Sequence, residues 1–269
     1  MKSVRIRKRA AAAALNLLIG LLALLWLVPV FWLVLSSFRA EQGAYTSYLW
    51  PKGFTFRNYV RLFTDRRLFD FPRWFGNTML VAGCSCVITT VLTLMVAYVY
   101  SRLRFPSRRF LMNASLVLGM FPGFMSIIAI YHFMKAVSLD QTLLALILVY
   151  SGGAALNYYI AKGYFDTIPK SLDEAAILDG ASNHTIFWRI ILPNSKPVIA
   201  TTAINAFINP IVDFIFVSVI MKDNYSNFTV AKGLYTMVDK TNIYEYYTVF
   251  CAGAVLVAIP VVLLFIRMQ

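Results

Sequence analysis

The chain has 269 residues, of which 59% are hydrophobic and 14% are charged, and its 25 Lys and Arg against 12 Asp and Glu give a formal charge of +13. A soluble domain typically has about a quarter charged residues, so this chain has too little polar surface for water on all sides, and its hydrophobicity excludes a disordered chain. The composition therefore predicts a membrane protein, in which the excess of Lys and Arg marks cytoplasmic segments rather than a nucleic-acid interface.

Long runs without charged residues predict six membrane-spanning helices. Only Asp213 interrupts these runs, which cover residues 10–38, 74–101, 110–134, 141–161, 197–221 and 246–266. The shortest run has 21 residues and would extend about 31 Å, which matches a hydrocarbon core of roughly 30 Å. The predicted fold is an all-α polytopic membrane protein, and residues 1–269 are expected to form a single transmembrane domain.

The N-terminal segment places five basic residues within the first nine positions, ahead of an apolar run that continues through Trp26 to Phe38. This run is too long for a secretory signal peptide and has no small-residue cleavage site, so an uncleaved first helix is expected. Four more basic residues lie in segment 102–109, after the second span. The positive-inside rule then predicts that both segments and both termini are cytoplasmic, although the predicted outer loop 39–73 also holds seven basic residues.

Three cysteines, Cys84, Cys86 and Cys251, fall inside predicted spans. The spacing of Cys84 and Cys86 is not the two-residue spacing of zinc sites, so no metal site is expected and all three are interpreted as packing residues.

The fourth span carries aromatic and amide side chains on both sides of Gly152 and Gly153. Small-ligand sites combine apolar walls with a few polar groups, so Tyr150 and Asn157 are candidates for lining a translocation pathway. Tyrosines near helix ends also serve as membrane-interface anchors, and this alternative stays open.

The longest predicted inner loop, residues 162–196, contains signals for two short helices. Ser171 and Glu174 have the spacing of a capping box, in which the Ser171 hydroxyl accepts from the Glu174 amide and Glu174 reaches back. Gly180 supplies a left-handed stop, and Ser182 can cap a second helix that ends before the next proline. The expected apolar faces are Leu172, Ala175 and Ala176 on the first helix and Ile186, Phe187, Ile190 and Ile191 on the second.

Two amphipathic helices outside the membrane should rest against the chain's own helix ends or against a partner. The loop also has a specific spacing, which runs Glu174-Ala175-Ala176, three residues, Gly180, nine residues, Ile190, one residue, Leu192-Pro193. This pattern resembles, without a gap, the EAA loop of the membrane subunits of binding-protein-dependent ABC importers. Residues 162–196 are called the EAA loop below.

The resemblance extends beyond the loop to the sugar-importer branch of the family and, within it, to the smaller permease of maltose/maltodextrin-type systems. The supporting segments are Phe165-Asp-Thr-Ile-Pro169, Ala97-Tyr98, Arg104-Phe105-Pro106, Arg108-Arg109, Pro122, Lys162-Gly-Tyr-Phe165 and Leu234-Tyr235. Such permeases usually continue into a short basic, Gly-rich tail, whereas this sequence stops at Gln269.

The resemblance implies a type I ABC importer permease fold in a bacterial inner membrane. It implies that the EAA loop sits in a cleft of a cytoplasmic ATPase, with Glu174 paired to a basic residue there and Gly180 allowing a close turn. The alternative is that Glu174 only closes its own capping box and Gly180 only ends a helix. The implied partners are a larger permease subunit, an ABC ATPase dimer, an extracytoplasmic sugar-binding protein and membrane lipids.

ATP hydrolysis is expected on the partner, because the chain has no Gly-x4-Gly-Lys-Ser/Thr phosphate loop. No cofactor is therefore expected on this chain, and ATP-Mg belongs to the partner ATPase. The chain itself is expected to be a transport subunit without catalytic residues.

Polar residues recur every four positions in the fifth span, at Thr201, Asn205, Asn209 and Asp213. This spacing places them on one side of a helix, which must face protein or water rather than lipid. Asn205, Asn209 and Asp213 are therefore candidates for a translocation pathway, and interhelical hydrogen bonding is the alternative. Pro210 leaves a backbone carbonyl free four residues earlier and predicts a kink there.

The predicted outer loop 237–246 precedes the last span. In the resemblance this loop reaches into the binding protein, and Asn242 and Tyr244 are the candidate contacts; a plain solvated connector is the alternative. A second class of function is a secondary transporter with Asp213 and His132 as a proton relay. A membrane enzyme is set aside, because neither a zinc nor a serine-nucleophile motif is present.

Overall fold

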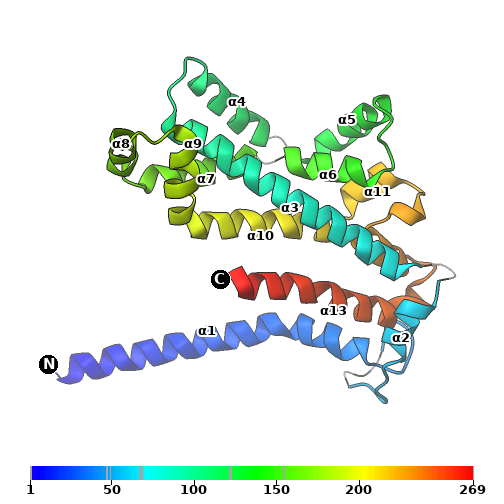
Figure 1. Cartoon of the computed structure of the whole chain (residues 1–269). Coiled ribbons are helices and arrows are strands. Elements are labelled where there is room, and N and C mark those ends of the chain that lie inside the picture. Colours follow the sequence, from blue (N-terminus) through cyan, green and yellow to red (C-terminus); the bar gives the residue numbers. More distant parts are fainter. Residues whose placement is uncertain are drawn as a thin grey trace. The chain divides into compact units, whose positions relative to one another are not determined.

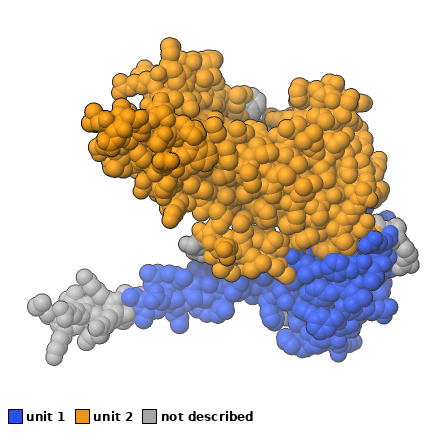
Figure 2. Space-filling view, viewed as in Figure 1, with its two compact units in different colours: residues 1–66, 236–256 blue, residues 67–235, 257–269 orange. Residues whose placement is uncertain are grey.

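The computed structural model describes residues 2–46, 48, 50–66, 69–120, 123–153 and 155–268. Pro122, one of the positions that carry the family resemblance, lies outside these residues. The chain forms two compact units, one of residues 1–66 and 236–256 and the other of residues 67–235 and 257–269 (Figure 2). The prediction of a single transmembrane domain stays a prediction.

Helices make up nearly all of the regular structure, and no named β-strand occurs in the described ranges. The α-helices in Figure 1 are α1 (Lys2–Ser37), α2 (Arg57–Thr64), α3 (Phe71–Arg102), α4 (Arg108–Met120), α5 (Gly123–Ala136), α6 (Leu143–Gly152), α7 (Ala155–Thr167), α8 (Lys170–Leu178), α9 (Asn183–Ile186), α10 (Lys196–Val212), α11 (Ile215–Met221), α12 (Val230–Met237) and α13 (Ile243–Met268). Shorter helical segments are η1 (Phe187–Ile191), η2 (Pro193–Ser195) and η3 (Tyr225–Asn227).

The helices account for the six predicted spans in two ways. In the described residues, α1, α3 and α13 are each long and apolar enough to cross a membrane alone. Three further spans are helix pairs with a break, namely α4 with α5, α6 with α7, and α10 with α11. The all-α polytopic fold is confirmed, and the fifth span, predicted as an unbroken run, is interrupted after Val212.

The break in the fifth span lies beyond Pro210. The helix α10 continues through Pro210 to Val212, and α11 follows at an angle of 59°. The backbone leaves the helical region at Asp213, whose Oδ1 accepts a hydrogen bond of 3.0 Å from the Phe216 amide. The kink predicted four residues before Pro210 therefore occurs after it, where the Asp213 side chain accepts from an amide in the first turn of the next helix.

The second unit is built around α3, which packs against α6, α7 and α10. The residues of α3 that are buried recur about every four positions, which places them on one face of the helix. Small and weakly polar side chains dominate this face: Thr78, Ala82, Ser85, Thr89, Thr93, Ala97 and Ser101. Such residues allow helix backbones to approach closely in a membrane protein.

Trp74, near the start of α3, is buried in protein, although it opens a predicted span, where tryptophans commonly anchor a helix at the membrane interface. Its side chain is 1% exposed, and its Nε1 donates a 2.7 Å hydrogen bond to the carbonyl of Tyr225. The ring also packs on Phe228 and against the backbone of Gly233, where an added Cβ would clash with it.

We expect Gly233→Ala to destabilise the protein, because the rigid indole of Trp74 would have to move to admit the new Cβ. Overpacking of this kind costs typically about 1–3 kcal/mol, which thermal unfolding of the detergent-purified protein would register as a lower Tm. The matched control is Gly83→Ala within α3, where a Cβ meets nothing within 4 Å. Equal Tm values for the two variants would contradict the close packing of Gly233 on Trp74.

Candidate functional site

The first helix of the EAA loop does not begin with the predicted capping box. The helix α8 starts at Lys170, with Pro169 at the N-cap and no side-chain hydrogen bond there. Ser171 is thus two positions inside the helix rather than at its cap, because Pro169 already ends the preceding segment. The Glu174 side chain is exposed and makes no hydrogen bond or ion pair with any described residue.

The predicted stop at Gly180 and the cap at Ser182 are both confirmed. Gly180 has a φ of +83°, its amide donates to Ile177, and the amide of Ala181 donates to Ala176, both at 2.9 Å. These two bonds form a Schellman motif, which favours glycine at the left-handed position. The Ser182 hydroxyl then accepts a 3.3 Å hydrogen bond from the amide of Thr185 and caps α9.

The two helices of the EAA loop differ in how they use their apolar residues. The second one buries Ile186, Phe187 and Ile191, and Ile190 packs partly buried beside them. They join a core with residues of α3 and α7: Leu94, Ala97, Tyr98, Ala161 and Phe165.

By contrast, α8 turns most of its apolar residues away from the chain. Ala176 is 8% exposed, but Leu172 and Ala175, which were expected to share its buried face, are exposed. Ile177 is exposed too, and Leu178 is 89% exposed. The outward surface of α8 therefore combines apolar side chains with the free carboxylate of Glu174.

An ion pair fixes α8 to the end of α3. The Arg102 Nε lies 2.7 Å from Asp173 Oδ2, and the two side chains are only 5% and 14% exposed. Arg102 also donates a 2.9 Å hydrogen bond to the carbonyl of Ile168. The sequence analysis used Arg102 only as one of the basic residues that orient the chain in the membrane, and nothing in the residue pattern predicts that it meets Asp173.

Two hydrogen bonds reinforce this attachment. Ser101 Oγ donates to Asp166 Oδ1 at 2.7 Å, and Tyr98 OH donates to the carbonyl of Asn183 at 3.2 Å. The last turn of α3 thus holds α7, α8 and α9 together.

The carboxylate of Asp173 responds to its surroundings at this junction. Burial raises the pKa of Asp173, and the charge of Glu174 raises it further, against the lowering by Arg102. As the pH falls, Asp173 is therefore protonated earlier than an ordinary aspartate, which weakens its pairing with Arg102.

The polar stripe of α10 points away from the core of its own unit. Asn205 and Asn209 are exposed, whereas Ala203 and Ala206 on the opposite side are buried. Thr201 is also exposed, but its hydroxyl bonds the carbonyl four residues earlier in the same helix.

Asp213 and Tyr150 are brought together at the breaks of two spans. Tyr150 OH donates a 3.2 Å hydrogen bond to Asp213 Oδ2, while Asp213 Oδ1 accepts a hydrogen bond from the Phe216 amide in the first turn of α11. Both oxygens of this carboxylate are therefore occupied within the chain. Asn157 is half-buried on α7 and forms no hydrogen bond with the described residues.

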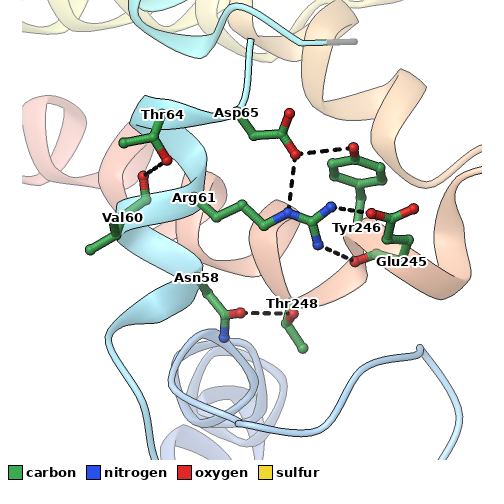
Figure 3. Close-up of polar contacts among 8 residues, drawn as sticks. All are labelled: Asn58, Val60, Arg61, Thr64, Asp65, Glu245, Tyr246 and Thr248. Atoms are coloured by element: carbon green, nitrogen blue, oxygen red, sulfur yellow. Dashed lines mark hydrogen bonds and ion pairs between the residues drawn. The ribbon is translucent and has the colours of Figure 1, made fainter. Parts of the chain in front are cut away.

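In the other unit, Arg61 of α2 lies at the centre of a polar cluster of Arg61, Asp65, Glu245 and Tyr246 (Figure 3). Its Nε donates to Asp65 Oδ2 at 3.2 Å, and its two terminal nitrogens donate to the side chain and the carbonyl of Glu245. The guanidinium also lies over the Tyr246 ring, 4.4 Å from the centroid. Burial lowers the pKa of Arg61, but the bonds to Glu245 and Asp65 raise it overall.

The Arg61 cluster holds the start of α13, where the two residues predicted to contact a binding protein lie: Asn242 directly precedes the helix and Tyr244 is its second residue. Tyr244 is 73% exposed. Asn242 is half-buried, and its Nδ2 donates a 2.9 Å hydrogen bond to the carbonyl of Thr236. A second contact, from Thr248 Oγ1 to Asn58 Oδ1 at 3.1 Å, also joins α13 to α2 (Figure 3).

The comparison with known proteins identifies the class. Residues 89–269 match the family described as the binding-protein-dependent transport system inner membrane component. The chain belongs to this family and is a multi-pass membrane protein.

Relatives and solved structures extend the likeness over the whole chain. The galactooligosaccharides transport system permease protein GanQ of Bacillus subtilis is 33% identical over 270 residues, which is 100% of this chain and 95% of that protein. The maltodextrin transport system permease protein MalD of Streptococcus pneumoniae is 31% identical, covering 99% of this chain and 94% of that protein. A chain of a bacterial ABC transporter involved in the import of the acidic polysaccharide alginate has the same fold, with a TM-score of 0.80 at 24% identity, covering 97% of this chain and 96% of that one.

These likenesses confirm the predicted resemblance to permeases of binding-protein-dependent ABC importers and the type I permease fold. They give no support to the alternative of a proton-coupled secondary transporter that uses Asp213 and His132. The relatives are named as permease proteins, that is, as transport subunits.

We expect Asp173→Ala and Arg102→Ala each to loosen the EAA loop, because breaking a mostly buried ion pair leaves one charge without its partner and costs about 3 kcal/mol or more. Hydrogen–deuterium exchange over residues 168–186 of the purified protein should rise in both variants. Glu174→Ala is the matched control, since it removes a neighbouring carboxylate that has no partner in the described chain. Unchanged exchange in Asp173→Ala would show that packing alone holds α8.

Proposed function

We propose that this chain is the membrane-spanning permease subunit of an ATP-driven importer of sugars, above all oligosaccharides such as maltodextrins. The printed functions of GanQ and MalD, galactooligosaccharide and maltodextrin transport, support this substrate class. The partners are a larger permease subunit, a cytoplasmic ABC ATPase dimer and an extracytoplasmic sugar-binding protein. The EAA loop and both termini face the cytoplasm of a bacterial cell.

The observation that carries the proposal is the orientation of α8. Asp173 and Ala176 fasten the helix inward, while Glu174 and the exposed Leu178 project outward. An exposed apolar patch beside a free carboxylate suits a cleft with apolar walls and a basic residue. We assign this cleft to the ATPase, so ATP-Mg binds there and this chain hydrolyses no ATP.

Coupling then follows from the attachment of α8 to α3. Closure of the ATPase dimer around ATP moves Glu174 and its helix. Because Arg102 is ion-paired with Asp173, the end of α3 moves together with α8. The spans that pack on α3 then change between inward-open and outward-open arrangements. Gly180 allows the tight reversal between α8 and α9, while Ala175, Ile190, Leu192 and Pro193 complete the EAA loop that docks.

The translocation pathway runs along the exposed stripe of α10. Asn205 and Asn209 face away from their own core, so water or the larger permease must meet them. Tyr150 and Asp213 hold the bend beside this stripe, and Asn157 lies on the neighbouring broken span. Amide side chains can bond the hydroxyl groups along the edge of a sugar.

On the extracytoplasmic side, Asn242 and Tyr244 contact the sugar-binding protein. The Arg61 cluster keeps these two residues in place, because Arg61 donates hydrogen bonds to both the side chain and the backbone carbonyl of Glu245. Arg61 is thus a positioning residue for docking.

Reconstitution of the chain with its genomic partner subunits tests the proposed coupling. We expect Glu174→Ala to lower both sugar uptake and ATPase activity stimulated by the binding protein about tenfold or more, since a hydrogen bond to a charged group contributes about 1.5–3 kcal/mol. The matched control is Asp179→Asn, which alters another exposed carboxylate at the end of the same helix. Full uptake and stimulated hydrolysis in Glu174→Ala would remove the coupling role of α8.

Arg61→Ala tests docking separately. We expect a several-fold higher binding-protein concentration for half-maximal ATPase stimulation, with unstimulated ATPase activity unchanged, because only the presentation of Asn242 and Tyr244 is disturbed. Arg57→Ala, which removes an exposed arginine of α2 that has no side-chain partner in the described chain, should behave like the wild type. If both variants shifted equally, general charge rather than the Arg61 cluster would guide docking.

A further inference from the structure

An apolar groove lies beside the basic turn that joins α3 to α4, and it shares no residue with the EAA loop or the α10 stripe. It has a volume of about 390 Å³ and is lined by Leu92, Met95, Val96, Val99, Phe105 and Leu111, together with Tyr100. This volume is within the range of small-ligand pockets, roughly 300–1,000 Å³. The groove occupies the side of α3 that turns away from the helix's buried face.

The turn between the helices closes one end of the groove. Phe105 stacks on Tyr100 with 6.5 Å between ring centroids and 20° between the planes. Arg108 donates a 2.8 Å hydrogen bond from Nε to the carbonyl of Tyr100. These contacts place the groove against the end of a membrane span, where acyl chains give way to headgroups.

Positive charge is concentrated at this closed end. Segment 102–109 has four arginines and no acidic residue. Arg102 is committed to Asp173, but Arg104 and Arg109 are exposed and pair with no described residue. An apolar groove at hydrocarbon depth thus continues into unpaired arginines at headgroup depth.

From this combination we infer that the groove between α3 and α4 binds an anionic phospholipid, with an acyl chain on the apolar walls and the phosphate between Arg104 and Arg109. Basic pockets beside membrane helices are suited to acidic lipid headgroups. A helix of another subunit could cover the apolar walls but would leave the arginine charge unanswered, whereas one acidic lipid satisfies both parts. In the proposed topology the lipid comes from the cytoplasmic leaflet.

A photoactivatable phospholipid tests the site on the assembled transporter in vesicles of phosphatidylcholine. The probe is phosphatidylglycerol with a diazirine near the end of one acyl chain, and the readout is the labelled peptide. We expect labelling of segment 92–111 that unlabelled phosphatidylglycerol competes for and phosphatidylcholine does not. Arg109→Gln should lower the labelling of this segment about fivefold, and Arg104→Gln should lower it by a similar factor. Labelling should fall further when both arginines are changed.

Two further variants make the result decisive. Lys196→Gln removes a basic residue from the start of α10, on the same predicted side of the membrane, and should leave labelling unchanged. Val96→Phe fills the groove without changing charge and should reduce labelling while the transporter still assembles. The inference would be overturned if both lipids competed equally for labelling, or if the arginine variants left labelling unchanged. It would also be overturned if a photo-crosslinking residue introduced in place of Leu111 reacted with the second permease instead of with lipid.

Discussion

The attachment of the EAA loop to the last turn of α3 is the constraint on which the rest of the site depends. The helix α8 has nine residues, and isolated helices shorter than about 12–15 residues are marginal in water. Its stability and its orientation must therefore come from tertiary contacts. Because successive residues of a helix are about 100° apart, fixing Asp173 and Ala176 inward obliges Glu174 to face outward. The buried ion pair with Arg102 thus selects which carboxylate a partner can reach.

Polar groups within the spans follow a related logic. A carboxylate at membrane depth is tolerated where the protein occupies its acceptors, and the structure provides this for Asp213 through Tyr150 and the amide of Phe216. The asparagines of the same stripe have no such partners in the described chain. The stripe therefore has two parts. Asp213 stabilises the bend of its own span, whereas the asparagines are accessible to a neighbour of α10. The even spacing in the sequence gives no indication of this division.

Local signals were predicted well, and contacts distant in sequence were not. The six apolar runs, the left-handed Gly180 and the Ser182 cap each depend on a few neighbouring residues, and all three appear in the structure. The capping box at Ser171 failed because the helix already begins at Lys170, after Pro169 at the N-cap. The burial of Trp74 was not predicted, because its contact with Gly233 lies far along the chain. Arg102 was predicted only as one of the four basic residues of segment 102–109, and its pairing with Asp173 was not predicted. To predict this pair, one must know that the end of α3 lies against α8, and the pattern of residues in the sequence does not give that information.

Three different parts of the helix α3 contact three different neighbours. Its small, weakly polar face packs against α10, α7 and α6, its final turn holds the EAA loop, and its opposite face forms the apolar groove. In the proposed coupling, a displacement of α8 reaches α3 through Arg102, which lies two residues before Arg104. A lipid phosphate held at Arg104 and Arg109 would stiffen that turn and so resist independent movement of α3 and α4. Coupling through α3 would then depend on the charge of the surrounding membrane as well as on the contacts within the chain.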